Sequence, residues 1–243
     1  MQVLQSCWKS AARTDRGKVR KRNEDSVLDQ PERGVWLVAD GMGGHQNGAL
    51  ASRLIVEEVA ELVPHDDLDQ QVKQVRQALH VVNRRLGYEV TVTADQPDAV
   101  MGSTVVALIG DQERAVCLWA GDSRCYLWRN QRLYQLSRDH SLLQQLIHED
   151  QMDPQEAARH PSANALTRAV GAHEQLVLEI LEFSVQPGDT LLLCSDGLYQ
   201  AVSAGSISHA LGLISPAAAV EYLFSHALSG PARDNISAVV MRR

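Results

Sequence analysis

Three aspartates in this sequence stand at the ends of short apolar runs, where a buried strand could present a carboxylate. The three places are residues 35–39 (VWLVA) leading into Asp40, residues 190–194 (TLLLC) followed closely by Asp196, and Asp234 just before a last apolar run. Apolar runs of strand length with no helical period are typical of buried strands. Since strands far apart in a sequence can meet in one fold, the three carboxylates could converge on one site.

Carboxylates that converge repel one another unless a cation neutralises them. Ligand sets made only of oxygen suit hard ions, so the three aspartates predict a site for Mg²⁺ or Mn²⁺. Glycines at positions 41, 43 and 44 would let the backbone turn sharply after Asp40 and approach a ligand closely. For Asp40 alone, an Asp-Gly hairpin turn explains the pattern as well. The repetition at Asp196-Gly197 favours the metal site, whereas Asp122 on the turn GDS is by itself interpreted as a turn residue.

A dense charged run, residues 20–25 (RKRNED), lies within the second of two strands expected near the N-terminus. One interpretation is a solvated face or turn, since charge runs are usually exposed. The other is a phosphate site, because an arginine fork can grip a phosphate bidentately while a nearby acid holds a cation that the same phosphate touches. The residue pattern alone leaves both interpretations open.

Blocks of strands and blocks of helices alternate along the chain. The apolar patterns predict strands at residues 4–12, 18–28, 35–39, 102–109, 114–120, 124–128, 132–136, 177–183, 190–194 and 236–241. They predict amphipathic helices at residues 47–62, 68–88, 206–211 and 216–228, with shorter helical pieces between residues 140 and 159. This segregation favours an α+β fold of antiparallel sheets with outer helices over a doubly wound parallel sheet.

Composition places the chain among ordinary soluble globular proteins, with 243 residues, 44% hydrophobic and 22% charged, and one large domain is expected. A formal charge of -7 argues against a general nucleic-acid binder. No apolar run is long enough to span a bilayer and the N-terminus lacks a signal-peptide pattern, so we expect a cytoplasmic protein without membrane insertion. Four cysteines without C-x-x-C spacing predict packed, reduced thiols rather than a zinc site.

A series of short motifs, weak singly but specific in this order, runs through nearly the whole chain. They are TDRGKVRKRNEDS (14–26), DGMGGH (40–45), MGST (101–104), GDSR (121–124), DHS (139–141), LTRAVG (166–171), CSDG (194–197) and RDNIS (233–237). In this set the chain resembles the metal-dependent serine/threonine protein phosphatases of the PP2C type, in their compact bacterial form. Within that family it looks most like stand-alone members that oppose a bacterial Ser/Thr kinase, including those that accompany type VI secretion loci.

The resemblance implies a fold and a domain organisation. The fold would be a four-layer α-β-β-α sandwich, with two antiparallel sheets flanked by helix pairs and the metals at one end. Residues 1–243 would form a single PP2C-like domain carrying a flap subdomain around residues 140–175. This flap would gate access of substrate and help to select phosphoprotein targets.

The resemblance also implies the metal ligands, by matched position. Asp40 would bridge two Mn²⁺ or Mg²⁺ ions, and Asp196 and Asp234 would complete the site of one of them. The Gly41 carbonyl would complete the other together with Asp25 or Glu24, an alternative that the resemblance leaves open. Asp122 would hold a third, weaker ion together with Asp196.

Two arginines match substrate-binding positions of the family: Arg20 would bind the phosphate and Arg168, in the Thr-Arg motif of the flap, would contact the substrate. One position departs from many eukaryotic relatives, because Met42 stands where they carry a histidine that acts as general acid. A thioether cannot donate a proton, so protonation of the leaving group must come from elsewhere. His45 and His140 are the alternatives by motif, and we interpret both as structural histidines.

The implied activity is hydrolysis of phosphoserine and phosphothreonine on proteins by a metal-activated water, with Arg20, Asp40 and Asp196 as its catalytic residues. The expected partners are phosphoproteins, with a Ser/Thr kinase as functional opponent, no nucleic acid, and a monomeric state. The alternative is a catalytically silent module that binds or scaffolds phosphoproteins with the phosphatase fold. Such a module would be expected to lack one of the metal carboxylates, and all of them are present.

Overall fold

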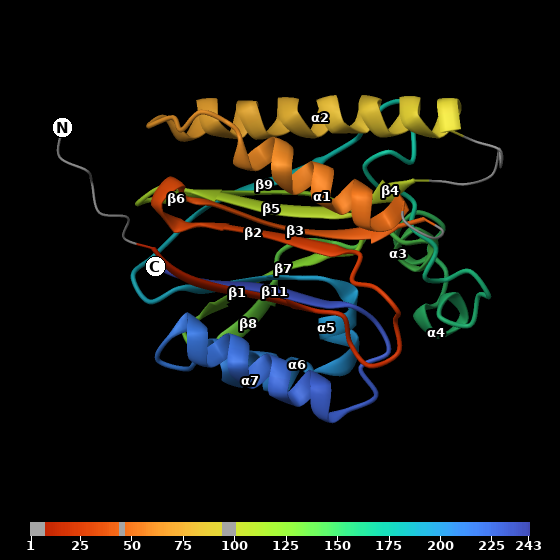
Figure 1. Ribbon diagram of the computed structural model, residues 1–243. Coiled ribbons are helices and arrows are strands. Elements are labelled where there is room, and N and C mark those ends of the chain that lie inside the picture. Colours follow the sequence, from red (N-terminus) through yellow and green to blue (C-terminus); the bar gives the residue numbers. More distant parts are fainter. Residues whose placement is uncertain (1–7, 44–46, 94–100) are drawn as a thin grey trace.

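Two antiparallel sheets lie face to face in the computed structural model, which describes residues 8–43, 47–93 and 101–243 (Figure 1). The first sheet has the strand order β1 (Lys9–Asp15), β11 (Ile236–Arg242), β10 (Thr190–Cys194), β7 (Arg124–Arg129) and β8 (Arg132–Gln135). The second has the order β2 (Asp25–Gln30), β3 (Val35–Met42), β5 (Val105–Gly110), β6 (Arg114–Ala120) and β9 (Glu179–Ser184), and the short β4 (Gly102–Ser103) pairs with the end of β3.

Helices cover the outer face of each sheet, which confirms the predicted α-β-β-α layers (Figure 1). The second sheet carries α1 (Asn47–Ala60) and α2 (Leu68–Thr93), and the first carries α5 (Asp196–Ala201), α6 (Ala204–Leu211) and α7 (Pro216–Ser229). Two short helices, α3 (Leu142–His148) and α4 (Pro154–Ala157), lie at one end of the sandwich. Among the helices described, even the longest is too polar to cross a lipid bilayer.

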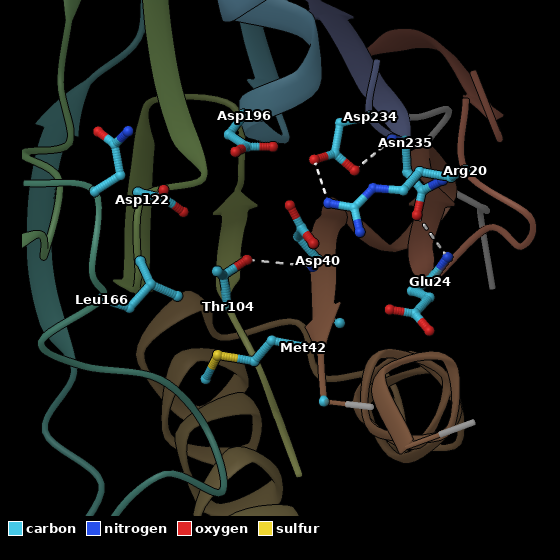
Figure 2. Close-up of a pocket in the computed structure, with 13 residues that line it drawn as sticks. Arg20, Glu24, Asp40, Met42, Thr104, Asp122, Leu166, Asp196, Asp234 and Asn235 are labelled. Carbon is cyan, nitrogen blue, oxygen red and sulfur yellow. Dashed lines mark hydrogen bonds and ion pairs between the residues drawn. The ribbon is translucent and has the colours of Figure 1, made fainter. Parts of the chain in front are cut away.

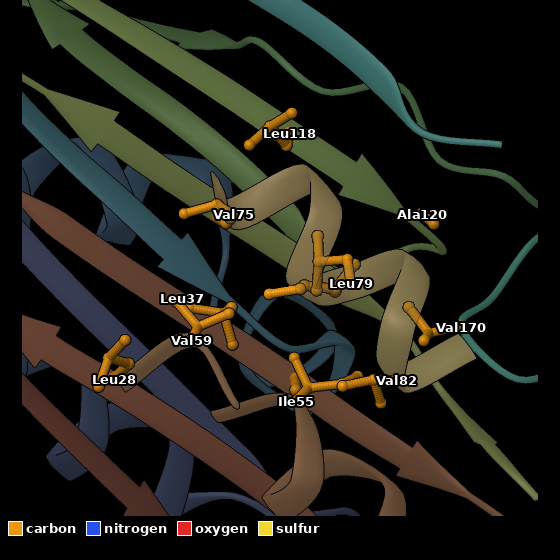
Figure 3. Close-up of a cluster of buried hydrophobic side chains, with 14 of the residues drawn as sticks. Leu28, Leu37, Ile55, Val59, Val75, Leu79, Val82, Leu118, Ala120 and Val170 are labelled. Atoms are coloured by element: carbon orange, nitrogen blue, oxygen red, sulfur yellow. The ribbon is translucent and has the colours of Figure 1, made fainter. Parts of the chain in front are cut away.

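Three apolar layers fill the spaces between the four layers of structure. Alternate residues of β3 face opposite ways, so Leu37 packs beneath α1 and α2 while Trp36 and Val38 pack between the sheets. Figure 3 shows the layer under the helices, where Ile55 and Leu79 meet the sheet. A third layer joins the first sheet to α5, α6 and α7. Burial on both faces explains why these strands read as continuous apolar runs.

The structure differs from the sequence-based expectation mainly at element ends. The first strand spans Lys9–Asp15 rather than residues 4–12, of which residues 1–7 lie outside the described part. The second begins at Asp25, not at residue 18, because the charged run before it forms a loop at the end of the sandwich. The helix α5 was not expected, since its six residues are too few to show a helical period.

Leu193 tests the layer between the sheets, because its side chain is fully buried there. We expect Leu193→Ala to lower the free energy of unfolding by about 2 to 5 kcal/mol, as the cavity left behind adds to the lost burial. Chemical denaturation followed by tryptophan fluorescence measures the change. The control is Ile214→Ala, at a side chain that is 91% exposed, which should stay within about 0.5 kcal/mol of the wild type.

Candidate active site and metal centre

The pleat of the strands brings polar side chains together at one end of the space between the sheets. In β3 the residues facing the other sheet are Trp36 and Val38, and Asp40 follows two residues later on the same face. The same alternation places Asp25 beside Asp40, since the two are direct cross-strand partners. Apolar packing therefore ends where the carboxylates begin.

A cavity of about 460 Å³ opens at this end of the sandwich (Figure 2). Its lining is dominated by acidic side chains and backbone from distant parts of the chain: Arg20, Glu24, Asp40, Gly41, Met42, Gly43, Thr104, Asp122, Asn164, Leu166, Asp196, Asp234 and Asn235. The tertiary structure thus brings together seven of the residues predicted for the site. They are Arg20, Glu24, Asp40, Gly41, Asp122, Asp196 and Asp234.

The backbone at Asp40 is fixed on both sides by hydrogen bonds from β4 and the residue that follows it. The Asp40 N–H donates to Thr104 Oγ1 at 3.2 Å, and its carbonyl accepts from Thr104 N at 2.8 Å and from Ser103 Oγ at 3.0 Å. Gly41 is required next, because a Cβ there would lie 2.0 Å from the carbonyl oxygen of Gly48. The close approach of α1 to the end of β3 therefore depends on both glycines.

The two acids Glu24 and Asp25 occupy different places, although the sequence leaves their roles open. Glu24 lines the cavity, whereas Asp25 lies behind it and is only 7% exposed. Ser195 Oγ donates to Asp25 Oδ2 at 2.8 Å, but Asp25 Oδ1 has no hydrogen-bond partner among the described residues. A buried carboxylate oxygen left in this state is costly unless a cation or water satisfies it.

Burial and mutual repulsion disfavour the charged forms of these acids. Burial, followed by the charges of Asp25 and Asp196, holds the pKa of Asp40 well above its usual value. Burial raises the pKa of Asp25 to about 6 and that of Asp122 to about 7, and in Asp122 the charge of Asp196 adds to it. The pKa of Asp196 is raised by burial and then by the charge of Asp234. Such a cluster of carboxyl groups is stabilised by positive charge.

This donor set fits divalent cations that prefer oxygen ligands. The Asp25 oxygen that has no hydrogen-bond partner among the described residues is an atom that such a cation would satisfy. Among the described residues, no three side chains of Asp, Glu, His or Cys are already arranged so that all of them could bind one metal ion. Mg²⁺ and Mn²⁺ keep several waters when they bind, so such an ion does not need a complete cage of side chains.

Arg20 and Asn235 organise the loop between β1 and β2 around the cavity. Arg20 Nη2 lies 2.7 Å from Asp234 Oδ2, and this contact raises the pKa of Arg20. The Asn235 amide accepts from Glu24 N at 2.9 Å and donates to the carbonyls of Arg16 and Arg22, both at 2.9 Å. One buried amide side chain thus fixes the loop that carries Arg20 and Glu24.

Arg168 does not line this cavity. It lies in a second cavity of about 390 Å³, where its Nη1 is 3.3 Å from His140 Nε2 and 3.9 Å from Glu179 Oε1. The two cavities adjoin the same stretch of chain, since Leu166 lines the first and the next residue, Thr167, lines the second. The predicted substrate contact of Arg168 would therefore involve a different part of the surface from the carboxylates.

The histidines considered for proton transfer are not in the described lining of the first cavity either. The ring of His140 is buried, with Nδ1 accepting from Gly121 N at 3.1 Å, and burial lowers its pKa. It fits a structural role, as expected. His45 lies outside the described residues, and Met42 lines the cavity without offering a proton donor.

Sequence reasoning missed the residues that support the site through their side chains. Asn235 and Ser195 each follow or precede a predicted ligand, so their positions in RDN and CSD could have indicated them. Thr104 belongs to the quoted MGST motif, but its bond to the Asp40 backbone depends on the pairing of strands far apart in sequence. Leu166 and Asn164 reach the cavity only because the chain from α4 folds back across it.

The sequence matches the family described as Protein phosphatase 2C over residues 15–227. Among solved structures, it is similar to PppA, described as a key regulatory component of T6SS in Pseudomonas aeruginosa. That likeness has a TM-score of 0.89 and 42% identity and covers 97% of both chains. The catalytic domain of the serine/threonine protein phosphatase PstP, in a complex with two manganese ions, is similar at a TM-score of 0.83 and 34% identity, over 97% of both chains.

Among curated proteins, the serine/threonine protein phosphatase PstP of Mycobacterium tuberculosis is 36% identical over 231 residues. The match covers 95% of this chain but 44% of PstP, so the chain spans less than half the length of that relative.

Asp40 offers a test of the cation site through stability. With free Mn²⁺ at 100 times its Kd, the free energy of unfolding of the wild type should rise by about 2.7 kcal/mol. Asp40→Asn should lose most of that rise, because it removes the carboxylate that the other acids of the cluster surround. In EDTA the same variant should be at least as stable as the wild type, since one repelled charge is gone.

Denaturant unfolding at pH 7.5 in Mn²⁺ and in EDTA measures both effects. Asp66→Asn, at an exposed aspartate between α1 and α2, is the matched control and should follow the wild type in both conditions. Equal stabilisation of Asp40→Asn and the wild type by Mn²⁺ would contradict the assignment of Asp40.

Proposed function

Since the chain belongs to the protein phosphatase 2C family of serine/threonine phosphatases, we propose that it hydrolyses phosphoserine and phosphothreonine esters of proteins in the acidic cavity. The observation that carries this proposal is the joint lining of one cavity by Arg20 and five acids. These are Glu24, Asp40, Asp122, Asp196 and Asp234. A phosphate monoester needs positive charge opposite its oxygens. The acids would provide that charge by binding divalent cations, and Arg20 would add its own.

The residues divide into two groups around Asp40. Asp40 would be shared by two ions, with Asp196 and Asp234 on one side and the Gly41 carbonyl with Glu24 on the other. Asp25, behind the cavity, would support this second side through its unpaired oxygen. Asp122 stands near Asp196, where a third ion would lie between them. Mn²⁺ or Mg²⁺ bound here would supply a nucleophilic water at neutral pH and positive charge for the phosphoryl group.

Arg20 would orient the phosphate. Its guanidinium has five N–H donors and uses Nη2 on Asp234, so other donors of the same fork can reach a phosphoryl oxygen. The contact with Asp234 also keeps the long side chain, which is 55% exposed, turned toward the cavity. Binding would therefore begin with an arginine that is already in place.

Protonation of the leaving alcohol would depend on water. Met42 has no acidic proton to donate, and the described lining of the cavity holds carboxyl groups but no histidine, lysine or tyrosine. Water held in this cavity of about 460 Å³ would then be the proton source. This arrangement limits catalysis by side-chain acids and places more of the rate enhancement on charge and positioning.

Residues 140–175, which include α3 and α4, would act as a flap that selects the substrate. The segment reaches the cavity through Leu166. The bridge of Val170 with Ser103 of β4 attaches the segment to the sandwich, and the bridge of Ser141 with Leu166 pairs two parts of the segment with each other. Arg168 faces the second cavity on the other side of this segment, where it could meet parts of a protein substrate away from the phosphate. We propose this region as the site of protein recognition.

The cellular role would be the reversal of phosphorylation by a bacterial Ser/Thr kinase. The similarity to PppA, described as a regulator of T6SS, supports a role in controlling such a secretion system. The substrates would be phosphoproteins of that pathway.

The direct test is hydrolysis of a phosphothreonine peptide by the full chain in Mn²⁺ and in EDTA. We expect turnover in Mn²⁺, loss of turnover in EDTA, and a fall of about 100-fold or more in kcat/KM for Asp196→Asn. Asp66→Asn serves as the control because it changes the same functional group far from the cavity.

Two outcomes would contradict the proposal. Turnover that survives EDTA would exclude the two-ion mechanism. Binding of Mn²⁺ and phosphopeptide by the wild type without any turnover would instead favour the silent phosphoprotein-binding module.

Exchanging residues 140–171 for those of a relative tests the flap. We expect the preference among phosphoprotein substrates to change, because the segment covers the side of the cavity that a protein would approach. Hydrolysis of a small aryl phosphate should stay close to that of the wild type, since none of the proposed metal ligands is exchanged. Competition between two phosphoproteins measures the preference, and an unchanged ratio would contradict the role of the flap.

A further inference from the structure

Three side chains stand directly behind Asp122 and Asp196 without lining the cavity: Arg124, Asp139 and Tyr199. We name them the Arg124 cluster. They come from three separate parts of the fold, namely the start of β7, the segment before α3, and the helix α5. The cluster is therefore a junction between the elements that carry the two acids.

Arg124 and Asp139 form a two-point ion pair that is largely shielded from water. Arg124 Nε donates to Asp139 Oδ1 at 2.9 Å and Nη2 donates to Oδ2 at 2.6 Å, while the two side chains are 22% and 9% exposed. A paired fork of this kind fixes both the position and the plane of the guanidinium. That plane matters because the guanidinium carbon lies 3.6 Å from the centre of the Tyr199 ring.

Tyr199 links the two acids. It lies three residues after Asp196 in α5, and its hydroxyl donates to the backbone carbonyl of Asp122 at 3.2 Å. Through this one side chain, the helix that begins with Asp196 is attached to the turn that presents Asp122. The Arg124 guanidinium on the face of the ring sets where that hydroxyl points.

Other partners hold the two residues beside Asp122 in the turn, Gly121 and Ser123, in place. Gly121 exchanges hydrogen bonds with His140, at 3.1 Å to the ring and 2.9 Å to the backbone. Ser123 Oγ lies 2.7 Å from Thr104 Oγ1. The contact from Tyr199 ties the turn to α5, and loosening it would let Asp122 and Asp196 move relative to each other.

We propose that Arg124, Asp139 and Tyr199 are positioning residues that set the spacing between the carboxylates of Asp122 and Asp196, and thereby the affinity for a divalent cation between them. The inference rests on the proposed function for the identity of the site. None of the three lines the cavity in which the ion would bind. Residues that orient metal ligands in this way typically change metal affinity or activity by 10- to 100-fold when they are replaced.

The strand β7 itself provides a matched control at its other end. Arg129 Nε donates to Asp189 Oδ1 at 2.8 Å and Nη2 donates to Oδ2 at 2.6 Å, with side chains that are 23% and 2% exposed. This pair has the same chemistry and burial as Arg124 with Asp139. It lies five residues along the strand, about 16 Å away.

The experiment compares Arg124→Lys with Arg129→Lys in the full chain, stripped of metal and titrated with Mn²⁺ by calorimetry. Both substitutions keep the charge and lose the planar fork, so both should lower the unfolding temperature. We expect only Arg124→Lys to weaken the weakest Mn²⁺ binding step, by about 10-fold. Tyr199→Phe, which keeps the ring and removes the hydroxyl, should weaken the same step with little change in unfolding temperature.

Equal Mn²⁺ affinities for Arg124→Lys, Arg129→Lys and the wild type would overturn the proposal, as would wild-type affinity in Tyr199→Phe if Arg124→Lys fails to fold. Absence of Mn²⁺ binding by the wild type would overturn it together with the metal centre. The phosphopeptide assay distinguishes failure of this proposal from failure of the proposed function. A wild type that binds Mn²⁺ but does not hydrolyse the phosphopeptide would contradict the proposed function alone.

Discussion

The burial of several carboxyl groups side by side is the constraint on which the rest of this structure depends. Asp25, Asp40, Asp122 and Asp196 all have raised pKa values, and burial is the largest cause in each. Their burial opposes folding of the metal-free chain and favours the binding of cations. The same feature that makes the end of the sandwich unstable by itself therefore makes it suited to hold divalent ions.

The apolar layers and the rigid backbone supply the stability that the acids remove. Three buried layers hold the two sheets and their helices together, and they end just before Asp40. The acids are then fixed by hydrogen bonds from neutral side chains, such as those of Ser195 to Asp25 and of Asn235 to the loop of Arg20. The residues proposed for function thus lie at one end of the sandwich, whereas the apolar layers that stabilise the fold run along the length of the sheets.

Much of the fold was predictable because its signals are local. The apolar runs that end at Asp40 and Cys194 are strands, and the amphipathic stretches from Asn47 and Leu68 are helices. Resemblance in the motifs then indicated the four layers, and the structural likenesses agree. The expectations that were wrong concern element ends, as at Asp25, where a loop around a functional site replaces the strand that the local pattern favours.

The sequence by itself determined which acids are available and that they stand at strand ends, because strand length and composition are properties of neighbouring residues. Only the tertiary structure decided that Glu24 lines the cavity while Asp25 lies behind it, since this depends on the pairing of β2 with β3. It also decided that Arg168 lies in a second cavity next to Glu179. These placements come from contacts between residues distant in sequence, for which the linear pattern of one chain carries no signal.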